Sequence, residues 1–169
     1  MNALLVKLWR LLRGTPQWYI LWFFHPKFII GVSGVVLNEQ KQILLQRHRF
    51  WRPGSWGLPS GYAHRNERLE ETLQREVREE TGYQISVSRC LRMVSGYRLR
   101  LEVSFLAHLT GGHLQLDPKE VIEARFFALD ELPEGLLPSH RDIIQLAFAE
   151  EQDASARSEG NKARGTVID

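Results

Sequence analysis

The stretch that decides the fold of this chain is GYAHRNERLEETLQREVREETGY, residues 61–83. It carries a high density of carboxylates between two glycines, Gly61 and Gly82. Clustered carboxylates repel one another unless a cation lies between them, and a hard divalent metal takes oxygen ligands and often arrives with substrate phosphates. The stretch therefore predicts a loop–helix–loop unit that presents carboxylates to a divalent cation.

A helical wheel drawn through this stretch turns two of its glutamates toward the protein interior. At about 100° per residue, Leu69, Leu73 and Val77 form one apolar stripe that is expected to face the core. Glu80 lies roughly 20° from the centre of that stripe and Glu76 roughly 60° from it. A carboxylate directed into a low-dielectric interior is unfavourable unless it is paired or bound to metal.

The alternative interpretation is a solvated surface helix held by ion pairs. Glu71 and Arg75 are four residues apart, and so are Arg75 and Glu79, which is the spacing of such pairs on a helix. The two inward glutamates and the bracketing glycines disfavour this interpretation. Gly82 suits the left-handed conformation that ends many helices.

The same residues resemble the signature of the Nudix hydrolases, called the Nudix box. It is written G-x5-E-x7-R-E-U-x-E-E-x-G-U, with U a bulky aliphatic residue. Its fixed positions are occupied by Gly61, Glu67, Arg75, Glu76, Val77, Glu79, Glu80 and Gly82. The last position departs from the pattern, because Tyr83 stands where an aliphatic residue is usual. The preceding WGLPS, residues 56–60, is similar to the family's W-x-L-P-G segment, with Ser60 in place of glycine.

The resemblance implies an α/β/α sandwich with a mixed β-sheet around the catalytic loop–helix–loop. It also implies hydrolysis of a diphosphate linkage in a nucleoside diphosphate derivative, with Mg²⁺ or Mn²⁺ as cofactor. A metal neutralises the anionic diphosphate, orients its oxygens and lowers the pKa of the attacking water. The ligands that the resemblance implies are Glu76, Glu79, Glu80 and a backbone carbonyl of Ser60 or Gly61.

Further acidic and basic residues have expected roles around these ligands. Glu67 is expected to act on the metal through water, or behind its ligands, at the helix entrance. Arg75 is expected to orient Glu79 or Glu67 by a charge-assisted hydrogen bond. The general base is either a box glutamate, with Glu79 as the candidate, or Glu120 on a later loop, for which Glu123 is a substitute. The alternative for both loop residues is a solvated charge.

A basic and aromatic segment before the WGLPS turn is the candidate substrate contact. The side chains that can meet phosphates there are Arg47, His48, Arg49 and Arg52. Trp51 or Phe50 can stack on a base. The alternative is a solvated basic loop with one aromatic side chain packed beneath it.

The family's markers of substrate class give less guidance. The proline that ADP-ribose hydrolases carry downstream of the box is missing, and the motif of NADH hydrolases is absent. We favour an ADP-ribose or nucleotide-sugar pyrophosphohydrolase, and the alternative enzyme is a nucleoside triphosphate pyrophosphohydrolase that sanitises the nucleotide pool. A Nudix-like module that binds nucleotides without hydrolysis is disfavoured, because such modules usually lose a box carboxylate or the arginine.

Composition limits the remaining choices. A chain of 169 residues forms one sizeable domain, and 43% hydrophobic with 25% charged residues is typical of a globular protein. A net charge of +2 is too small to indicate a specific nucleic-acid partner. Cys90 is the one cysteine, so an intramolecular disulfide is excluded and a reducing, cytoplasmic compartment is predicted.

The N-terminal segment is apolar and basic. Residues 2–13 have leucines at helical spacing with Lys7, Arg10 and Arg13 as their charges, and residues 18–24 are apolar throughout. Neither run reaches the roughly 18 apolar residues that a membrane-spanning helix needs. Acidic residues are absent up to Pro26. Two interpretations stay open: packing on the domain or on a partner subunit as a homodimer, or peripheral contact of residues 2–24 with a membrane.

Three parts are predicted along the chain: an N-terminal helical extension over residues 1–26, a Nudix domain over 27–150, and a disordered polar tail over 151–169. Expected strands within the domain cover residues 28–37, 42–49, 101–110 and 123–128. A last helix is expected over residues 140–150 with Ser139 as its N-cap.

Overall fold

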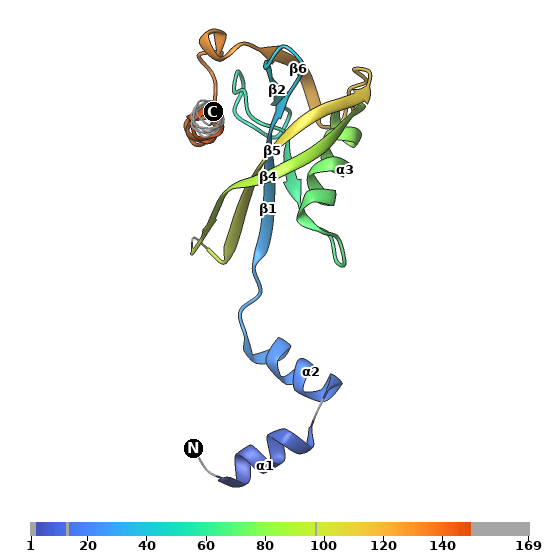
Figure 1. The fold of residues 1–169 in the computed structure, drawn as a ribbon, viewed down its shortest axis with the longest axis vertical. Coiled ribbons are helices and arrows are strands. Elements are labelled where there is room, and N and C mark those ends of the chain that lie inside the picture. The colour runs from blue at the N-terminus through green and yellow to red at the C-terminus, as the bar shows by residue number, and fades with distance from the viewer. Residues whose placement is uncertain (1–2, 13, 97, 150–169) are drawn as a thin grey trace, which may run out of the picture.

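The computed structural model describes residues 3–12, 14–96 and 98–149 (Figure 1). Two N-terminal helices, α1 (Ala3–Leu11) and α2 (Thr15–Phe24), precede a mixed sheet, α3 (Leu69–Thr81) and a C-terminal helix over residues 138–149. Among the described residues, no helix is long and apolar enough to cross a membrane. The tail predicted over residues 151–169 lies outside the described residues.

Six strands form a single sheet. Their bounds are β1 Ile29–Leu37, β2 Ile43–His48, β3 Ser60–Tyr62, β4 Tyr83–Ser95, β5 Arg100–Gly112 and β6 Val121–Phe127. The order is β4-β5-β1-β2-β6, and β5 runs parallel to β1 along the whole length of β1. On its other edge, β1 pairs with β3 at residues 31–33 and with β2 only at Leu37 and Ile43. This change of neighbour lets β3 lie between β1 and α3, which contacts both strands.

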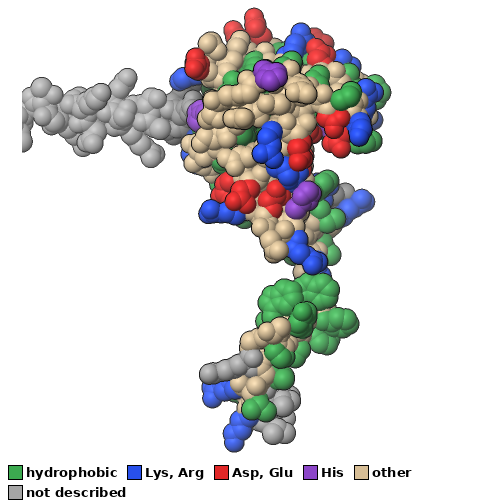
Figure 2. Space-filling view, turned by 90° about the vertical axis from the view of Figure 1, so that its right-hand side faces the viewer, with side chains coloured by type: hydrophobic (Ala, Val, Ile, Leu, Met, Phe, Trp, Pro, Cys, Tyr) green, Lys and Arg blue, Asp and Glu red, His purple; other side chains and the backbone are tan. Residues whose placement is uncertain are grey.

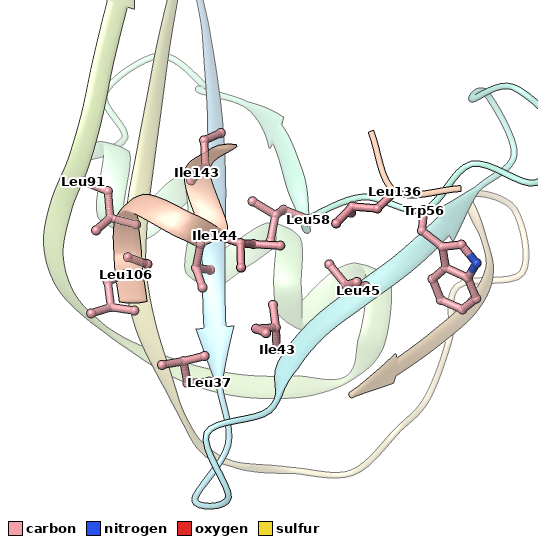
Figure 3. Packing of buried hydrophobic residues seen from close by; sticks show 12 residues of the cluster. Leu37, Ile43, Leu45, Trp56, Leu58, Leu91, Leu106, Leu136, Ile143 and Ile144 are labelled. Carbon is pink, nitrogen blue, oxygen red and sulfur yellow. The ribbon is translucent and has the colours of Figure 1, made fainter. Parts of the chain in front are cut away.

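Alternation along the strands gives the sheet two buried faces. Val36 and Leu44 belong to a core cluster with Val77 of α3. Their chain neighbours belong to a second cluster with the C-terminal helix, in which Leu45 and Ile144 are fully buried. Figure 3 shows this second cluster, with Ile144 beside the sheet residues. The sheet is therefore covered by one helix on each face, which confirms the predicted α/β/α sandwich.

Both ends of α3 have the local interactions that their sequence requires. The backbone N–H of Arg68 donates to Oε2 of Glu71 at 3.0 Å, which satisfies a backbone group at the helix start. Gly82 has a φ of 75° and donates its N–H to the carbonyl of Arg78 at 2.9 Å. This is the left-handed helix end that the sequence predicted for Gly82.

The C-terminal helix begins earlier than expected. It starts at residue 138, so Ser139 lies in its first turn and not at the N-cap position. Pro138 explains the difference, because the fixed φ of proline suits the first helical turn, where its missing N–H has no partner to lose. A short 3₁₀ helix, Leu129–Glu131, links β6 to this region.

The N-terminal helices extend away from the sheet (Figure 1). Helix α2 buries none of its residues. In Figure 2 its hydrophobic side chains form a continuous group below the domain that contains the sheet. Within the part of the chain that the structure describes, no residue of α2 is therefore buried against the sheet domain.

Candidate active site

Glu80 is the buried carboxylate at the centre of the site. Its side chain is 3% exposed, and the Gln46 side chain donates to its Oε2 at 2.8 Å. The pKa of Glu80 is raised from 4.5 to about 8, chiefly by burial; the hydrogen bond from Gln46 lowers it, and the nearby charges of Glu76, Glu120 and Glu79 add to the rise. A carboxylate in this position is destabilised as an anion unless a cation neutralises it.

Arg75 connects three other carboxylates of the loop–helix–loop unit. Its Nη1 lies 2.8 Å from Oε1 of Glu76 and 3.3 Å from Oε2 of Glu79. Its Nε and Nη2 donate to the two carboxylate oxygens of Glu67 at 2.7 and 3.0 Å, and Nη2 also donates to the carbonyl of Tyr62. The guanidinium therefore holds the loop and the metal-facing glutamates in one arrangement, and these contacts raise its own pKa.

Glu67 lies at the entrance of α3. Besides Arg75, its carboxylate accepts hydrogen bonds from the backbone N–H of His64 at 3.0 Å and the hydroxyl of Thr72 at 2.9 Å. The hydrogen bonds from Arg75 and then from His64 lower the pKa of Glu67 to about 2. Glu67 is thus kept ionised and fixed by donors, which leaves little freedom for proton transfer.

Glu120 lies on the loop before β6 and faces the same region. Nε2 of His48, at the end of β2, lies 3.5 Å from Oε1 of Glu80 and 3.7 Å from Oε2 of Glu120. One ligand atom from each of His48, Glu80 and Glu120 lies within 4.8 Å of the others. The Glu120 side chain is 48% exposed, so it borders the solvent while Glu80 is enclosed.

Gly61 leaves room for Glu76. A side chain at Gly61 would collide with the carboxylate of Glu76, because β3 passes directly over that part of α3. Ser60 and Gly61 both line the cleft that contains the box glutamates. The backbone of β3 thus lies against Glu76, where its carbonyls were expected to complete a metal site.

The carboxylates open into a cleft of about 980 Å³. The sequence-predicted residues that line it are His48, Phe50, Trp51, Ser60, Gly61, Arg75, Glu76, Glu79, Glu80 and Glu120. Glu67 lies behind the cleft, on Arg75. Aromatic residues Phe50 and Trp51 stand at one end, near His48. Arg92 and Arg100 come from β4 and β5, on the other side of β1 in the sheet.

Three predicted phosphate contacts do not line this cleft. Arg47 lies 3.3 Å from Glu123 through Nη1, and Nε of Arg49 donates to the carbonyl of Pro118 at 2.7 Å. Arg52 is exposed and is likewise not among the lining residues. Successive side chains of a strand point to opposite faces, so Arg47 turns away from the face that carries Gln46 and His48.

Sequence reasoning missed two residues of the site. Gln46 is fully buried and holds Glu80, and the alternation of β2 is the signal that places it on the α3 face. His140 lines the cleft, and its Nδ1 accepts the N–H of Leu58 at 2.9 Å. Burial lowers the pKa of His140 to about 4, so its ring is neutral near pH 7.

The donor set fits a hard divalent metal. Glu76, Glu79, Glu80 and Glu120 supply carboxylate oxygens in one cleft, and backbone carbonyls of β3 adjoin Glu76. The pKa of Glu80 is raised chiefly by burial and further by the neighbouring carboxylates, and a bound cation would stabilise its ionised form against both. The chemistry of these residues therefore agrees with Mg²⁺ or Mn²⁺.

Comparison with known proteins places this geometry in a family. Residues 27–147 match the model of the NUDIX domain. The chain is 34% identical over 124 residues to the NAD-capped RNA hydrolase NudC of Photorhabdus laumondii, and the match covers 71% of this chain but 44% of that relative. The chain thus spans less than half the length of the curated relatives it matches.

Solved structures show the same fold. An ADP-ribose pyrophosphatase from Streptococcus suis is 26% identical with a TM-score of 0.60, and the match covers 74% of this chain and 91% of that one. A UDP-X diphosphatase is 23% identical with a TM-score of 0.66, covering 91% of this chain and 73% of that one. Given the carboxylate site and these matches, the chain belongs to the Nudix hydrolase family.

Proposed function

We propose that this protein is a metal-dependent pyrophosphohydrolase that cleaves the diphosphate linkage of a nucleoside diphosphate derivative, with ADP-ribose or a nucleotide sugar as the favoured substrate. The observation that carries the proposal is the convergence of Glu76, Glu79, Glu80 and Glu120 in one cleft. The lining of the cleft comes from strands on either side of β1. Such a lining offers separate contacts to a nucleoside and to a second group that are joined by a diphosphate.

Each group of residues has a distinct task in this proposal. A bound divalent metal would neutralise the diphosphate and lower the pKa of the attacking water. Arg75 keeps Glu76 and Glu79 in place by hydrogen bonds to both. Phe50 and Trp51 offer ring faces to a base, and Arg100 offers a cation to the second group or its phosphate.

Glu120 is the general base in this proposal. Its carboxylate is half exposed at the cleft and has a histidine, His48, as its near neighbour. The box candidate Glu79 is instead 3.3 Å from the Arg75 guanidinium, so its carboxylate already has an ion-pair partner. This contrast favours Glu120 for proton removal and leaves Glu79 as a metal ligand.

The relatives support this substrate class and add a second candidate. The ADP-ribose pyrophosphatase of S. suis matches over most of its own length. The curated relatives are called NAD-capped RNA hydrolases, and NAD also joins two nucleosides through a diphosphate. An NAD-type dinucleotide is therefore the second substrate candidate. A nucleoside triphosphate remains the alternative substrate from a different chemical class.

The decisive experiment is a substrate panel with the purified full chain. ADP-ribose, UDP-glucose, NADH, NAD-capped RNA and 8-oxo-dGTP are incubated with Mg²⁺ or Mn²⁺, and the products are separated by chromatography. We expect the highest kcat/KM for ADP-ribose or UDP-glucose, with two monophosphate products. Pyrophosphate release from the triphosphate as the main activity would contradict the proposal, and background turnover of the whole panel would favour a binding module.

Matched variants separate catalysis from folding. Glu79→Gln and Glu120→Gln should each lower kcat by about 10²-fold or more, because each removes a carboxylate that acts on the metal or the water. Glu70→Gln is the control, since Glu70 is an exposed glutamate in the first turn of the same helix. Equal activity of Glu120→Gln and Glu70→Gln would remove Glu120 from the mechanism.

A further inference from the structure

The side chains of α2 are apolar in every direction around the helix. Six large apolar residues are between 45% and 77% exposed: Trp18, Tyr19, Leu21, Trp22, Phe23 and Phe24. At about 100° per residue these six positions are spread around the whole circumference. A helix that is apolar on all sides is normally surrounded by protein or by lipid. Nothing in the described part of the chain covers α2, as Figure 2 shows for the face in view.

The charges of the same segment have one sign. The cations up to residue 38 are Lys7, Arg10, Arg13 and Lys27, and the first acidic residue of the chain is Glu39. Nζ of Lys27 lies 4.5 Å from the ring centroid of Trp22 and donates to the carbonyl of Phe23 at 3.3 Å. The Lys27 ammonium therefore lies at the C-terminal end of the apolar helix, and Lys7 and Arg10 lie on α1 before it.

We propose that residues 3–28 bind the surface of a negatively charged lipid bilayer. Tryptophan and tyrosine favour the boundary between headgroups and acyl chains, where an apolar ring and a polar tip are both satisfied. Each lysine or arginine of this segment is attracted to the negatively charged headgroups of an anionic bilayer. Helix α2 has 10 residues. Its length of about 15 Å is half of the hydrocarbon thickness, so it enters one leaflet and does not span.

A second copy of the chain fits these observations less well. Two α2 helices in contact would each cover one side of the other and leave the opposite aromatic side chains in water. Their segments would also bring cations of the same sign together without an acidic partner before Glu39. A bilayer surrounds the apolar side chains and neutralises the cations at once, which is the reason for preferring it.

The test is flotation of the full-length protein with lipid vesicles in a density gradient. One set of vesicles is phosphatidylcholine alone, and the other contains phosphatidylglycerol as well. We expect the protein to float with the anionic vesicles, and the bound fraction to fall as salt is raised. Replacing Lys7 and Arg10 by glutamine should weaken binding to anionic vesicles by about fivefold for each cation removed.

A matched pair of double variants distinguishes the segment from the rest of the surface. Phe23→Glu with Phe24→Glu should weaken binding at least about a hundredfold, because two side chains lose their burial in lipid. Leu114→Glu with Ile122→Glu makes the same charge change at two exposed apolar residues of the catalytic domain and should leave binding unchanged. Equal loss in both double variants would overturn the proposal.

Light scattering of the lipid-free protein completes the test. A wild-type dimer that becomes a monomer in the Phe23 and Phe24 double variant, without flotation of the wild type, would overturn the proposal in favour of a second copy. A wild-type protein that stays in the dense fraction with anionic vesicles would overturn it whatever the oligomeric state. Turnover of the proposed soluble substrates should not change in the α2 variants, so failure here is distinguishable from failure of the proposed function.

Discussion

The substitution Glu80→Gln should stabilise the metal-free protein while it removes the response to magnesium. Glu80 is buried and has a pKa of about 8 in place of 4.5, chiefly because of its burial. Each unit of pKa difference corresponds to about 1.4 kcal/mol. The ionised carboxylate therefore lowers the free energy of unfolding, on the order of 4 to 5 kcal/mol at pH 8 and above. Glutamine has the same shape and can still accept the hydrogen bond from Gln46.

The pH dependence has a definite sign. Below pH 4.5 the carboxyl is protonated in both the folded and unfolded protein, so it has no effect on stability there. Between 4.5 and about 8 the folded protein binds more protons at Glu80 than the unfolded protein does, so stability falls as pH rises. The unfolding free energy of Glu80→Gln relative to wild type should thus increase by about 3.5 kcal/mol from pH 5 to pH 8.

The assay is urea unfolding followed by circular dichroism, in EDTA and then in magnesium. Glu70→Gln, on the exposed side of the same helix, is the control and should follow wild type at every pH. Magnesium should stabilise the wild type, since a ligand that binds the folded state shifts the equilibrium toward it, and should stabilise Glu80→Gln much less. A flat difference between Glu80→Gln and wild type across the pH range would refute the reasoning, as would equal stabilisation by magnesium.

Two further substitutions test the packing behind the carboxylates. Gly61→Ala should lower kcat by about tenfold or more, because the added methyl group displaces the Glu76 carboxylate. Gly111→Ala is the control and should keep wild-type kcat, because its methyl group meets only ordinary contacts. Equal kcat in both variants would contradict this prediction. Gln46→Leu should raise the magnesium concentration for half-maximal activity by about 10- to 100-fold, since it removes the donor that orients Glu80. An unchanged magnesium titration would show that Gln46 acts in packing alone.

The helical wheel accounts for the burial of the box glutamates. Glu80, Glu76 and Glu79 lie roughly 20°, 60° and 120° from the centre of the apolar stripe. Their side chains are 3%, 14% and 55% exposed, in the same order. Sequence could predict this because one rigid helix fixes the direction of each side chain relative to its own core face.

The wheel fails for Arg75, where a second element intervenes. Arg75 lies about 160° from the stripe centre, which is the solvent side of an isolated helix. Its side chain is nonetheless only 15% exposed, because the loop before α3 folds over it and Glu67 and the carbonyl of Tyr62 accept its hydrogen bonds. A pattern within one helix carries no information about the loop that covers it.

The β2 segment shows a different limit. The sequence predicts that Arg47 meets phosphates together with Arg49 and Arg52, yet Arg47 lies within β2, which continues through His48 and alternates between two faces. Arg47 lies opposite Glu123 in the pairing of β2 with β6, and this pairing explains the ion pair between them. The alternation could be read from the sequence, whereas the choice of β6 as neighbour is a property of the sheet order, which distant residues determine.

The same pairing positions the proposed general base. His48 pairs with Val121, and the backbone N–H of Arg49 donates to the carbonyl of Glu120 at 2.7 Å. Glu120 is therefore held beside the end of β2 by backbone hydrogen bonds, although its side chain is half exposed. Glu76 and Glu79 depend on α3 and Arg75, while Glu120 depends on the register of β2 and β6. Because different structural elements supply them, a change in the β2–β6 register should alter proton transfer while Glu76 and Glu79 keep their arrangement.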